Sequence, residues 1–253
     1  MLEIVFPERD KQKYYDIHFK YILNIFKYLN YKITFEKRPW FTVTINGKDF
    51  LFDYADTSNP AETTLPMFKL HCIEEKEGVI PFSPVSFYDW ELYYKLEKEI
   101  KYKHTGHISY RQRDYGTAIA RRKEVRDILK ALPGIKTELC GQGQYWSEIK
   151  DCLVSIFVPG AFNNMLDRGH WQYMAFGSVT ISPRLPEMLP FGNKLTPYIH
   201  YVKCEDDYSD LLDKIDFCRS NPMNCINISK NAKELFQEVG TPEALGKWIE
   251  SRI

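Results

Sequence analysis

Short apolar segments alternate with amphipathic helical segments through the second half of the chain. Strands are expected near residues 107, 137, 155 and 180, and the residues between them have helical periodicity. Neighbouring parallel strands need a long crossover, and a helix between two strands supplies one. The alternation therefore predicts an α/β domain with a parallel, doubly wound sheet.

The first hundred residues predict a smaller α/β lobe. Its strands are expected at residues 2–6, 32–35 and 41–52, and a helix at 14–29. The pair Asn46-Gly47 suits a tight turn inside the last of these strands. A charged helix from Glu91 to Lys103 is expected to bridge two domains. The predicted organisation is an N-terminal lobe at 1–103, a C-terminal lobe at 104–240 and a final helix at 241–253 that packs back on the first lobe.

Composition excludes several classes of protein. Hydrophobic residues make up 44% of the chain and aromatic residues 15%, as in a globular protein. The net charge of zero argues against nucleic acid as a partner, because duplex binding depends on an excess of cations. No signal peptide and no membrane span are recognised, so a cytoplasmic protein is expected. The six cysteines lack zinc-site spacing and are expected to be reduced core thiols.

The stretch from Asn164 to Pro190 predicts a helix that runs into a strand, with a break at Gly177. Arg168 offers a planar set of donors to a diphosphate, and Gln172 offers a donor and an acceptor to sugar hydroxyls. This combination favours a nucleotide-sugar as the ligand. The alternative is an amphipathic helix with an exposed arginine.

A second basic segment precedes the helix expected at 117–132. The strand at 106–110 leads into Arg111 and Arg113, and the helix carries Arg121, Arg122 and Arg126 away from its inward side. The inward side is expected to consist of the apolar residues Ile119, Val125, Ile128 and Leu129. A strand, a basic turn and a helix form a typical phosphate-binding arrangement. A predicted turn at 141–144 would let a ligand approach the backbone at Gly143.

Carboxylates follow the strands of the first lobe. Asp53 and Asp56 come directly after the apolar strand that ends near residue 52, and Asp89 lies in an aromatic, proline-rich loop at 80–90. Loops beyond the carboxyl ends of strands are where α/β sheets bind ligands. These residues are candidates for chemistry, and the alternative is that they cap turns. Downstream, a strand is expected at 198–202 and helices at 209–218 and 229–239, the last capped by Ser229.

Several weak motifs occur in an order that resembles a known family. They are Arg168 to Ile181, Leu195 to Val202, Asp206 to Ile215 and Ile228 to Phe236, within a match of roughly residues 106–240. The order is similar to the donor domain of the glycosyltransferase family that contains the protein O-glucosyltransferases and the fungal capsule-associated xylosyltransferases. Small glycosyltransferases of large DNA viruses are similar as well. The exostosin-like transferases are the relatives most easily confused with it.

The resemblance implies a GT-B-like α/β fold, with two Rossmann-like lobes and a cleft between them. It implies a UDP-sugar bound mainly by the second lobe, an acceptor bound by the first, and usually no need for a metal or cofactor. It makes Arg111, Arg113 and Arg168 candidate diphosphate ligands, with Gln172 and Ser178 close by.

The expected reaction is attack of an acceptor hydroxyl, on a glycan or protein, at the anomeric carbon of the donor. Xylose and glucose are the sugars expected, with inversion and without a metal. Such a reaction needs a general base and cations that hold the leaving diphosphate. Asp56 is the preferred base, followed by Asp53 and Asp89.

Two other functions remain open. A nucleotide-dependent hydrolase or phosphotransferase would use magnesium held by carboxylates such as Asp114 and Asp167. A sugar-binding module without catalysis would present a docking face of tryptophans, for which the candidates are Trp40, Trp90, Trp146 and Trp171.

Overall fold

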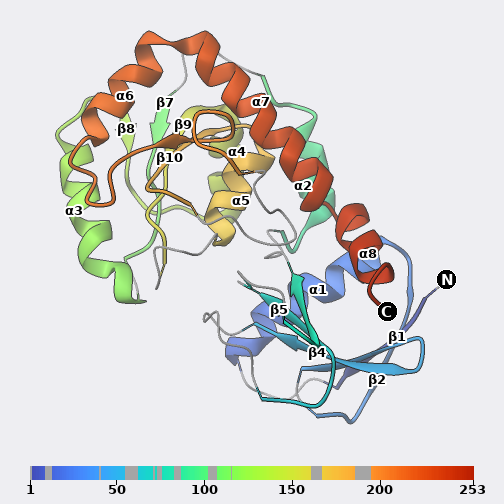
Figure 1. Cartoon of the computed structure of the whole chain (residues 1–253). Helices are drawn as coiled ribbons and strands as arrows, with labels where there is room; N and C mark the ends of the chain where they lie inside the picture. The colour runs from blue at the N-terminus through green and yellow to red at the C-terminus, as the bar shows by residue number, and fades with distance from the viewer. Residues whose placement is uncertain are drawn as a thin grey trace. The chain divides into compact units, whose positions relative to one another are not determined.

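The chain divides into two compact units, each with its own sheet (Figure 1). The first unit contains β1 to β6, α1 and α8, and the second begins at Glu91 and runs to Gln237 near the end of α7. The computed structural model describes residues 2–8, 13–39, 41–54, 62–70, 72, 76–82, 87–101, 107–114, 116–160, 167–185 and 195–253, with the backbone alone at 13–19.

The first unit has a six-stranded mixed sheet in the order β2-β1-β3-β4-β5-β6. The bounds of its elements are β1 Glu3–Pro7, α1 Lys13–Tyr28, β2 Lys32–Glu36, β3 Thr42–Ile45, β4 Lys48–Asp53, β5 Met67–Leu70, β6 Val79–Phe82 and α8 Pro242–Glu250. The pairs β1/β2, β4/β5 and β5/β6 are parallel, whereas β3 is antiparallel to both of its neighbours. The predicted opening of strand, helix, strand and hairpin is confirmed.

The turn of the hairpin has the backbone geometry that its two residues favour. Asn46 and Gly47 have φ angles of 50° and 80°, as the mirror-image turns of two-residue hairpins require. The sequence reading of residues 80–90 as a loop was wrong at its start, because Val79 to Phe82 form β6. Proline has no amide hydrogen, and Pro81 is tolerated in β6 because this strand is at the edge of the sheet.

The last helix belongs to the first unit. Trp248 of α8 donates from Nε1 to the carbonyl of Pro81 at 2.8 Å, and Tyr31 Oη hydrogen-bonds Glu250. Thr241 caps the helix by accepting from the amide of Ala244 at 3.3 Å.

The second unit has a five-stranded sheet that is parallel throughout, in the order β11-β10-β9-β7-β8. Its elements are α2 Trp90–Glu97, β7 His107–Ser109, a 3-10 turn Gly116–Ala118, α3 Ile119–Lys130, β8 Ile135–Lys136, α4 Gln142–Asp151, β9 Cys152–Ile156, α5 Arg168–Ala175, β10 Val179–Ser182, β11 Val202–Lys203, α6 Leu211–Ser220 and α7 Pro222–Val239. Numbered along the chain, the strand order is 2-1-3-4-5, a doubly wound arrangement. The predicted parallel sheet is confirmed.

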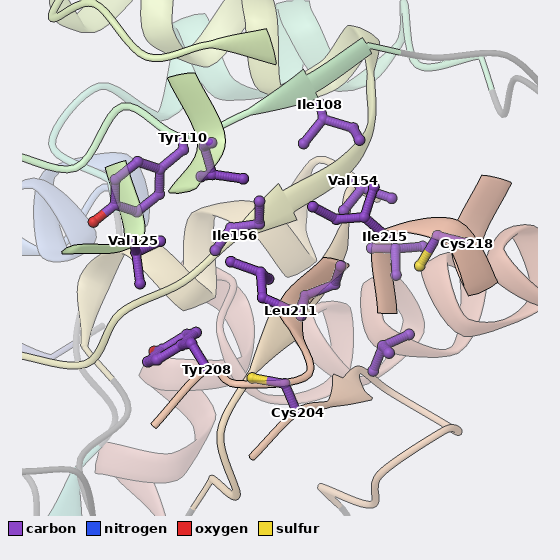
Figure 2. Close-up of a cluster of buried hydrophobic side chains, with 14 of the residues drawn as sticks. Ile108, Tyr110, Val125, Val154, Ile156, Cys204, Tyr208, Leu211, Ile215 and Cys218 are labelled. Atoms are coloured by element: carbon purple, nitrogen blue, oxygen red, sulfur yellow. The ribbon is translucent and has the colours of Figure 1, made fainter. Parts of the chain in front are cut away.

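One face of this sheet packs against α3 and α6. Figure 2 shows the cluster, in which Ile108, Val154 and Ile156 of the strands meet Val125 of α3 and Leu211 of α6. Ser109 and Ser155 alternate with these residues and therefore point to the opposite face, which α4 and α5 cover.

Several boundaries in the second unit differ from the sequence expectation. The helix expected at Glu91 to Lys103 is α2, which ends at Glu97. The helix α4 begins at Gln142, so Gly143 lies in its first turn and not in a loop. Residues 198–200 form a turn in which Tyr198 has a φ of 60°, and the strand β11 starts only at Val202. The helix α7 begins at Pro222, so Ser229 lies inside it and donates its hydroxyl to the carbonyl of Gly177 instead of capping.

Among the residues that the structure describes, no helix combines the length and the apolar character needed to cross a membrane.

Candidate functional site

The carboxyl ends of β7 and β9 lie side by side where the strand order of the second sheet reverses. In open α/β sheets, ligands bind beyond the strands at this point. Gln112, which follows β7, joins the two loops: its Nε2 donates to the carbonyl of Val158 at 3.0 Å, and its Oε1 accepts from the amide of Val158 at 2.5 Å. The backbone beyond the two strands is therefore fixed.

Arg122 lies beneath these loops, on the first part of α3. Its side chain is 3% exposed. Nη1 donates to the carbonyl of Arg113 at 2.8 Å, and Nη2 donates to the carbonyl of Val158 at 3.3 Å and lies 3.8 Å from Asp167 Oδ2. One buried guanidinium thus connects the loop after β7, the loop after β9 and the start of α5.

Arg126, one turn further along α3, supports the same edge of the sheet. It donates to the carbonyls of Gln112 and Thr137, and its Nη2 lies 3.1 Å from Asp114 Oδ1. Its guanidinium also lies over the ring of Tyr110, 5.2 Å from the centroid.

Two buried tyrosines complete this support. Tyr110 Oη donates to the carbonyl of Arg122 at 3.1 Å, and Tyr208 Oη donates to the carbonyl of Phe157 at 2.8 Å. Burial raises the pKa of both phenols, so both remain protonated donors at neutral pH. A binding site needs hydrogen-bond donors in fixed positions, and this rigid edge of the sheet can supply them.

Arg122 and Arg126 lie on the inward side of α3, so the prediction that they point away from it was wrong. The inward stripe is Arg122, Val125, Arg126 and Leu129, whereas Ile119 is 39% exposed. Their spacing with Val125 and Leu129, i, i+3, i+4, i+7, could have shown this, because residues at these positions share one side of a helix. The prediction of a surface position rested only on the polar character of arginine.

The start of α5 reaches this edge from the loop after β9. Asp167 is the N-cap residue, and its Oδ1 accepts from the amide of Gly169 at 2.8 Å. Arg168 is the first residue of the helix and is half-buried. The predicted helix that runs into a strand, with Arg168 at its open end, is confirmed.

The remaining arginines predicted to bind the donor have different surroundings. Arg111 is buried against Glu148, with Nε 2.5 Å and Nη2 2.9 Å from its carboxylate oxygens, so its guanidinium is engaged within the protein. Arg113 is exposed beyond β7, and its side chain has no partner among the described residues. Arg121, on α3, lies 3.7 Å from Glu124 and 5.9 Å from the ring centroid of Tyr208.

The structure does not bring together the other three residues predicted to bind the donor, Gly143, Gln172 and Ser178. Gly143 is exposed in the first turn of α4, which begins beyond the carboxyl end of β8. Gln172 is only 3% exposed in the middle of α5. Ser178 precedes β10, at the amino edge of the sheet, and its hydroxyl lies 2.7 Å from that of Ser155.

Of the three carboxylates proposed for catalysis, Asp56 lies outside the described residues. Asp53 ends β4 and is 7% exposed, and its Oδ2 lies 3.3 Å from Nζ of Lys69, whose side chain is fully buried. Asp89 is half-buried directly before α2. A substrate hydroxyl therefore has little access to Asp53.

A further arginine at the carboxyl edge was absent from the sequence prediction. Arg184 follows β10, is exposed, and has no partner among the described residues. Two carboxylates near the strand reversal, Asp114 and Asp167, are paired with Arg126 and Arg122. Within the described part of the chain, this edge therefore carries more guanidinium groups than carboxylates, which favours an anionic ligand.

His170 of α5 is fully buried between aromatic rings. Its ring centroid lies 5.4 Å from that of Phe157 and 6.3 Å from that of Tyr201. Neither ring nitrogen has a hydrogen-bond partner among the described residues. Burial, with a smaller effect of His200, lowers the pKa of His170 to about 3.

This pKa predicts a loss of stability in mild acid. The unfolded chain protonates His170 near pH 6.5 and the folded chain only near pH 3, so the unfolded state binds the extra proton between these values. The free energy of unfolding should therefore fall by about 1.4 kcal/mol per pH unit below pH 6.5 from this residue. Urea unfolding of the wild type and of His170→Met at pH 7.5 and 5.5 measures the difference. Equal pH dependence in the two proteins would contradict the prediction.

No protein-family model matches the chain. The chain is similar to the solved structure of a glycosyltransferase from Rickettsia africae, with a TM-score of 0.52 and 14% identity over 96% of this chain and 82% of that one. At this identity the similarity shows the fold, and the expected GT-B-like α/β fold is confirmed. A sucrose-phosphate synthase from Thermosynechococcus elongatus aligns over 57% of this chain and 37% of its own, with a TM-score of 0.43 and 14% identity.

Two curated viral proteins match shorter segments. "Uncharacterized protein 179R" of Invertebrate iridescent virus 6 is 38% identical over 61 residues, which are 24% of this chain and 5% of that protein. "Uncharacterized protein 035R" of Invertebrate iridescent virus 3 is 36% identical over 47 residues, which are 19% of this chain and 4% of that protein. The matched part thus spans a small fraction of either viral protein.

Proposed function

We propose that this chain is a glycosyltransferase that binds a nucleotide-sugar at the carboxyl edge of the second sheet and transfers the sugar to an acceptor hydroxyl. The observation that carries the proposal is the strand reversal at β7 and β9, where rigid loops meet an excess of arginines. The fold shared with a protein described as a glycosyltransferase supports it. The viral matches support a viral origin for part of the chain.

The donor in this proposal is a UDP-sugar, with xylose or glucose as the sugar and a glycan or glycoprotein as the acceptor. Arg168 and Arg113 hold the diphosphate. Guanidinium groups bind phosphate oxygens in a bidentate manner and stabilise the charge that develops as the diphosphate leaves. They can replace a divalent metal in this role, so the proposed reaction is metal-independent.

A carboxylate acts as general base on the acceptor hydroxyl, which then attacks the anomeric carbon with inversion. Asp56 remains the preferred residue and Asp89 the next, because Asp53 is enclosed and paired with Lys69. Replacing Asp56 by Asn should lower turnover by about 10²- to 10⁴-fold, the usual contribution of a general base, and leave UDP-sugar affinity unchanged. Steady-state kinetics and titration calorimetry measure the two effects. Asp89→Asn is the matched variant, and full activity of Asp56→Asn would remove Asp56 from this role.

A thermal-shift screen with UDP, GDP and their sugars tests the function. A ligand present at 100 times its Kd stabilises the folded state by about 2.7 kcal/mol, which raises the melting temperature. The proposal expects a shift with UDP-sugars that persists in the presence of EDTA. A shift that needs magnesium would favour the hydrolase or phosphotransferase, and no shift with any nucleotide would favour the sugar-binding module.

Two carboxylates near the strand reversal are paired with arginines, and this pairing bears on the hydrolase alternative. Asp114 lies 3.1 Å from Arg126 and Asp167 lies 3.8 Å from Arg122. A magnesium ion bound by these carboxylates would have to compete with the two arginines, so their arrangement favours the glycosyltransferase over the alternative.

A further inference from the structure

We infer that Arg184 is a third diphosphate-binding residue, which acts from the opposite side of β9 to Arg113. Neither the sequence patterns nor the resemblance had indicated Arg184. The inference rests on the proposed function, because it concerns the anionic part of the same ligand.

The two arginines follow the strands on either side of β9. Ser109 of β7 pairs with Ser155 of β9, and Arg113 comes four residues after Ser109. Ile181 of β10 pairs with Ile156 of β9, and Arg184 comes three residues after Ile181.

On the β7 side, Gln112 and Val158 are joined by two hydrogen bonds beyond the strands. On the β10 side, the amide of Phe157 donates to the carbonyl of Ile181 at 2.9 Å. Neighbouring strands lie about 4.8 Å apart, so the strands that lead to the two arginines are separated by roughly 10 Å across β9. Two long side chains at this separation can converge on one diphosphate.

Both arginines extend from fixed backbone. The carbonyl of Arg113 accepts from the buried Arg122 at 2.8 Å. Arg184 lies between Pro183, whose ring restricts φ, and Leu185, which is 2% exposed and donates its amide to Tyr201 Oη at 3.1 Å. Because the backbone is already ordered, the binding of an anion has to order the side chains alone.

Neither guanidinium is neutralised within the described part of the chain. The structure shows no ion pair or hydrogen bond for either side chain there, whereas Arg111, Arg122 and Arg126 are all engaged. Exposed arginines on the outer helices are paired locally: Arg219 of α6, for example, lies 3.6 Å from Asp216.

Titration calorimetry of the full chain with UDP, inorganic pyrophosphate and uridine tests the inference. Replacing Arg184 by Ala should raise the Kd for UDP and for pyrophosphate about tenfold or more, the effect of losing one charge-assisted hydrogen bond. The affinity for uridine should not change. Arg184→Lys keeps the charge without the planar set of donors, so it should lose less affinity for UDP and pyrophosphate than Arg184→Ala. Arg219→Ala, which removes an exposed arginine of the same unit, is the control and should bind all three ligands like the wild type.

The outcomes separate this inference from the proposed function. If the wild type binds UDP and Arg184→Ala binds UDP and pyrophosphate equally well, the inference is wrong and the proposed function stands. An equal loss of affinity for uridine would also overturn the inference, since Arg184 would then not act on the anionic part of the ligand. If the wild type binds no nucleoside diphosphate, the proposed function fails and this inference fails with it.

Discussion

Replacing Arg122 by Met is expected to lower the free energy of unfolding of the second unit by about 3 kcal/mol and to remove nucleotide binding. The side chain is 3% exposed and holds three groups. Without it, the carbonyl of Arg113 loses this donor, the carbonyl of Val158 keeps the bond from Gln112, and the carboxylate of Asp167 loses a nearby positive charge. A buried acceptor without a donor incurs its full desolvation penalty.

Urea unfolding, followed by tryptophan fluorescence, measures this effect, and the buried Trp146 and Trp171 report on the second unit within that signal. Arg121→Ala is the matched control, because Arg121 is the preceding residue of α3 and has a 39% exposed side chain. Arg121→Ala should lower the free energy of unfolding by about 0.5 kcal/mol or less. If Arg122→Met is as stable as this control, Arg122 does not hold the two loops and the rigid edge described above is wrong.

Replacing Arg168 by Ala is expected to lower UDP-sugar turnover by about 10²- to 10³-fold while the fold is retained. Arg168 is half-buried at the first position of α5, where Asp167 already caps the helix, so the helix does not depend on the arginine. The diphosphate gains negative charge as it leaves, and the loss of a guanidinium that stabilises this charge reduces the rate.

Initial rates with saturating donor, together with the melting temperature, separate the effect on turnover from an effect on folding. Arg168→Lys should recover part of the rate, because it keeps the charge but not the bidentate geometry. Turnover of Arg168→Ala equal to that of Arg219→Ala would remove Arg168 from the site.

The alternation of strands and helices in the second half was predictable because each element carries its own periodicity. Four of the parallel strands, β7 to β10, followed the apolar pattern, and the hairpin at Asn46-Gly47 followed from turn chemistry. The prediction failed at positions where tertiary contacts determine the local structure. Ser229 has the chemistry of a helix cap, but Gly177 offers its hydroxyl an acceptor inside the fold. Tyr198 and its neighbours have strand propensity, yet the turn before β11 holds Tyr198 at positive φ.

The site was only partly predictable for the same reason. The places of Arg168 and Arg113 beside strand ends were predictable, because Arg113 lies in the loop after β7 and Arg168 opens the helix α5. Arg122 could not be separated from Arg121 by residue type, and only the helical stripe that it shares with Val125 and Leu129 distinguishes the buried arginine from the exposed one. Arg184 carries no local motif, and its place beside β9 follows from strand order, which a single sequence does not specify.

The most direct measurement is a crystal structure of the full chain soaked with UDP. The account predicts the diphosphate beyond the carboxyl ends of β7 and β9, within hydrogen-bond distance of Arg168 and Arg113. UDP bound at the amino edge of the second sheet, near Cys152 and Ser229, or bound within the first unit, would contradict it.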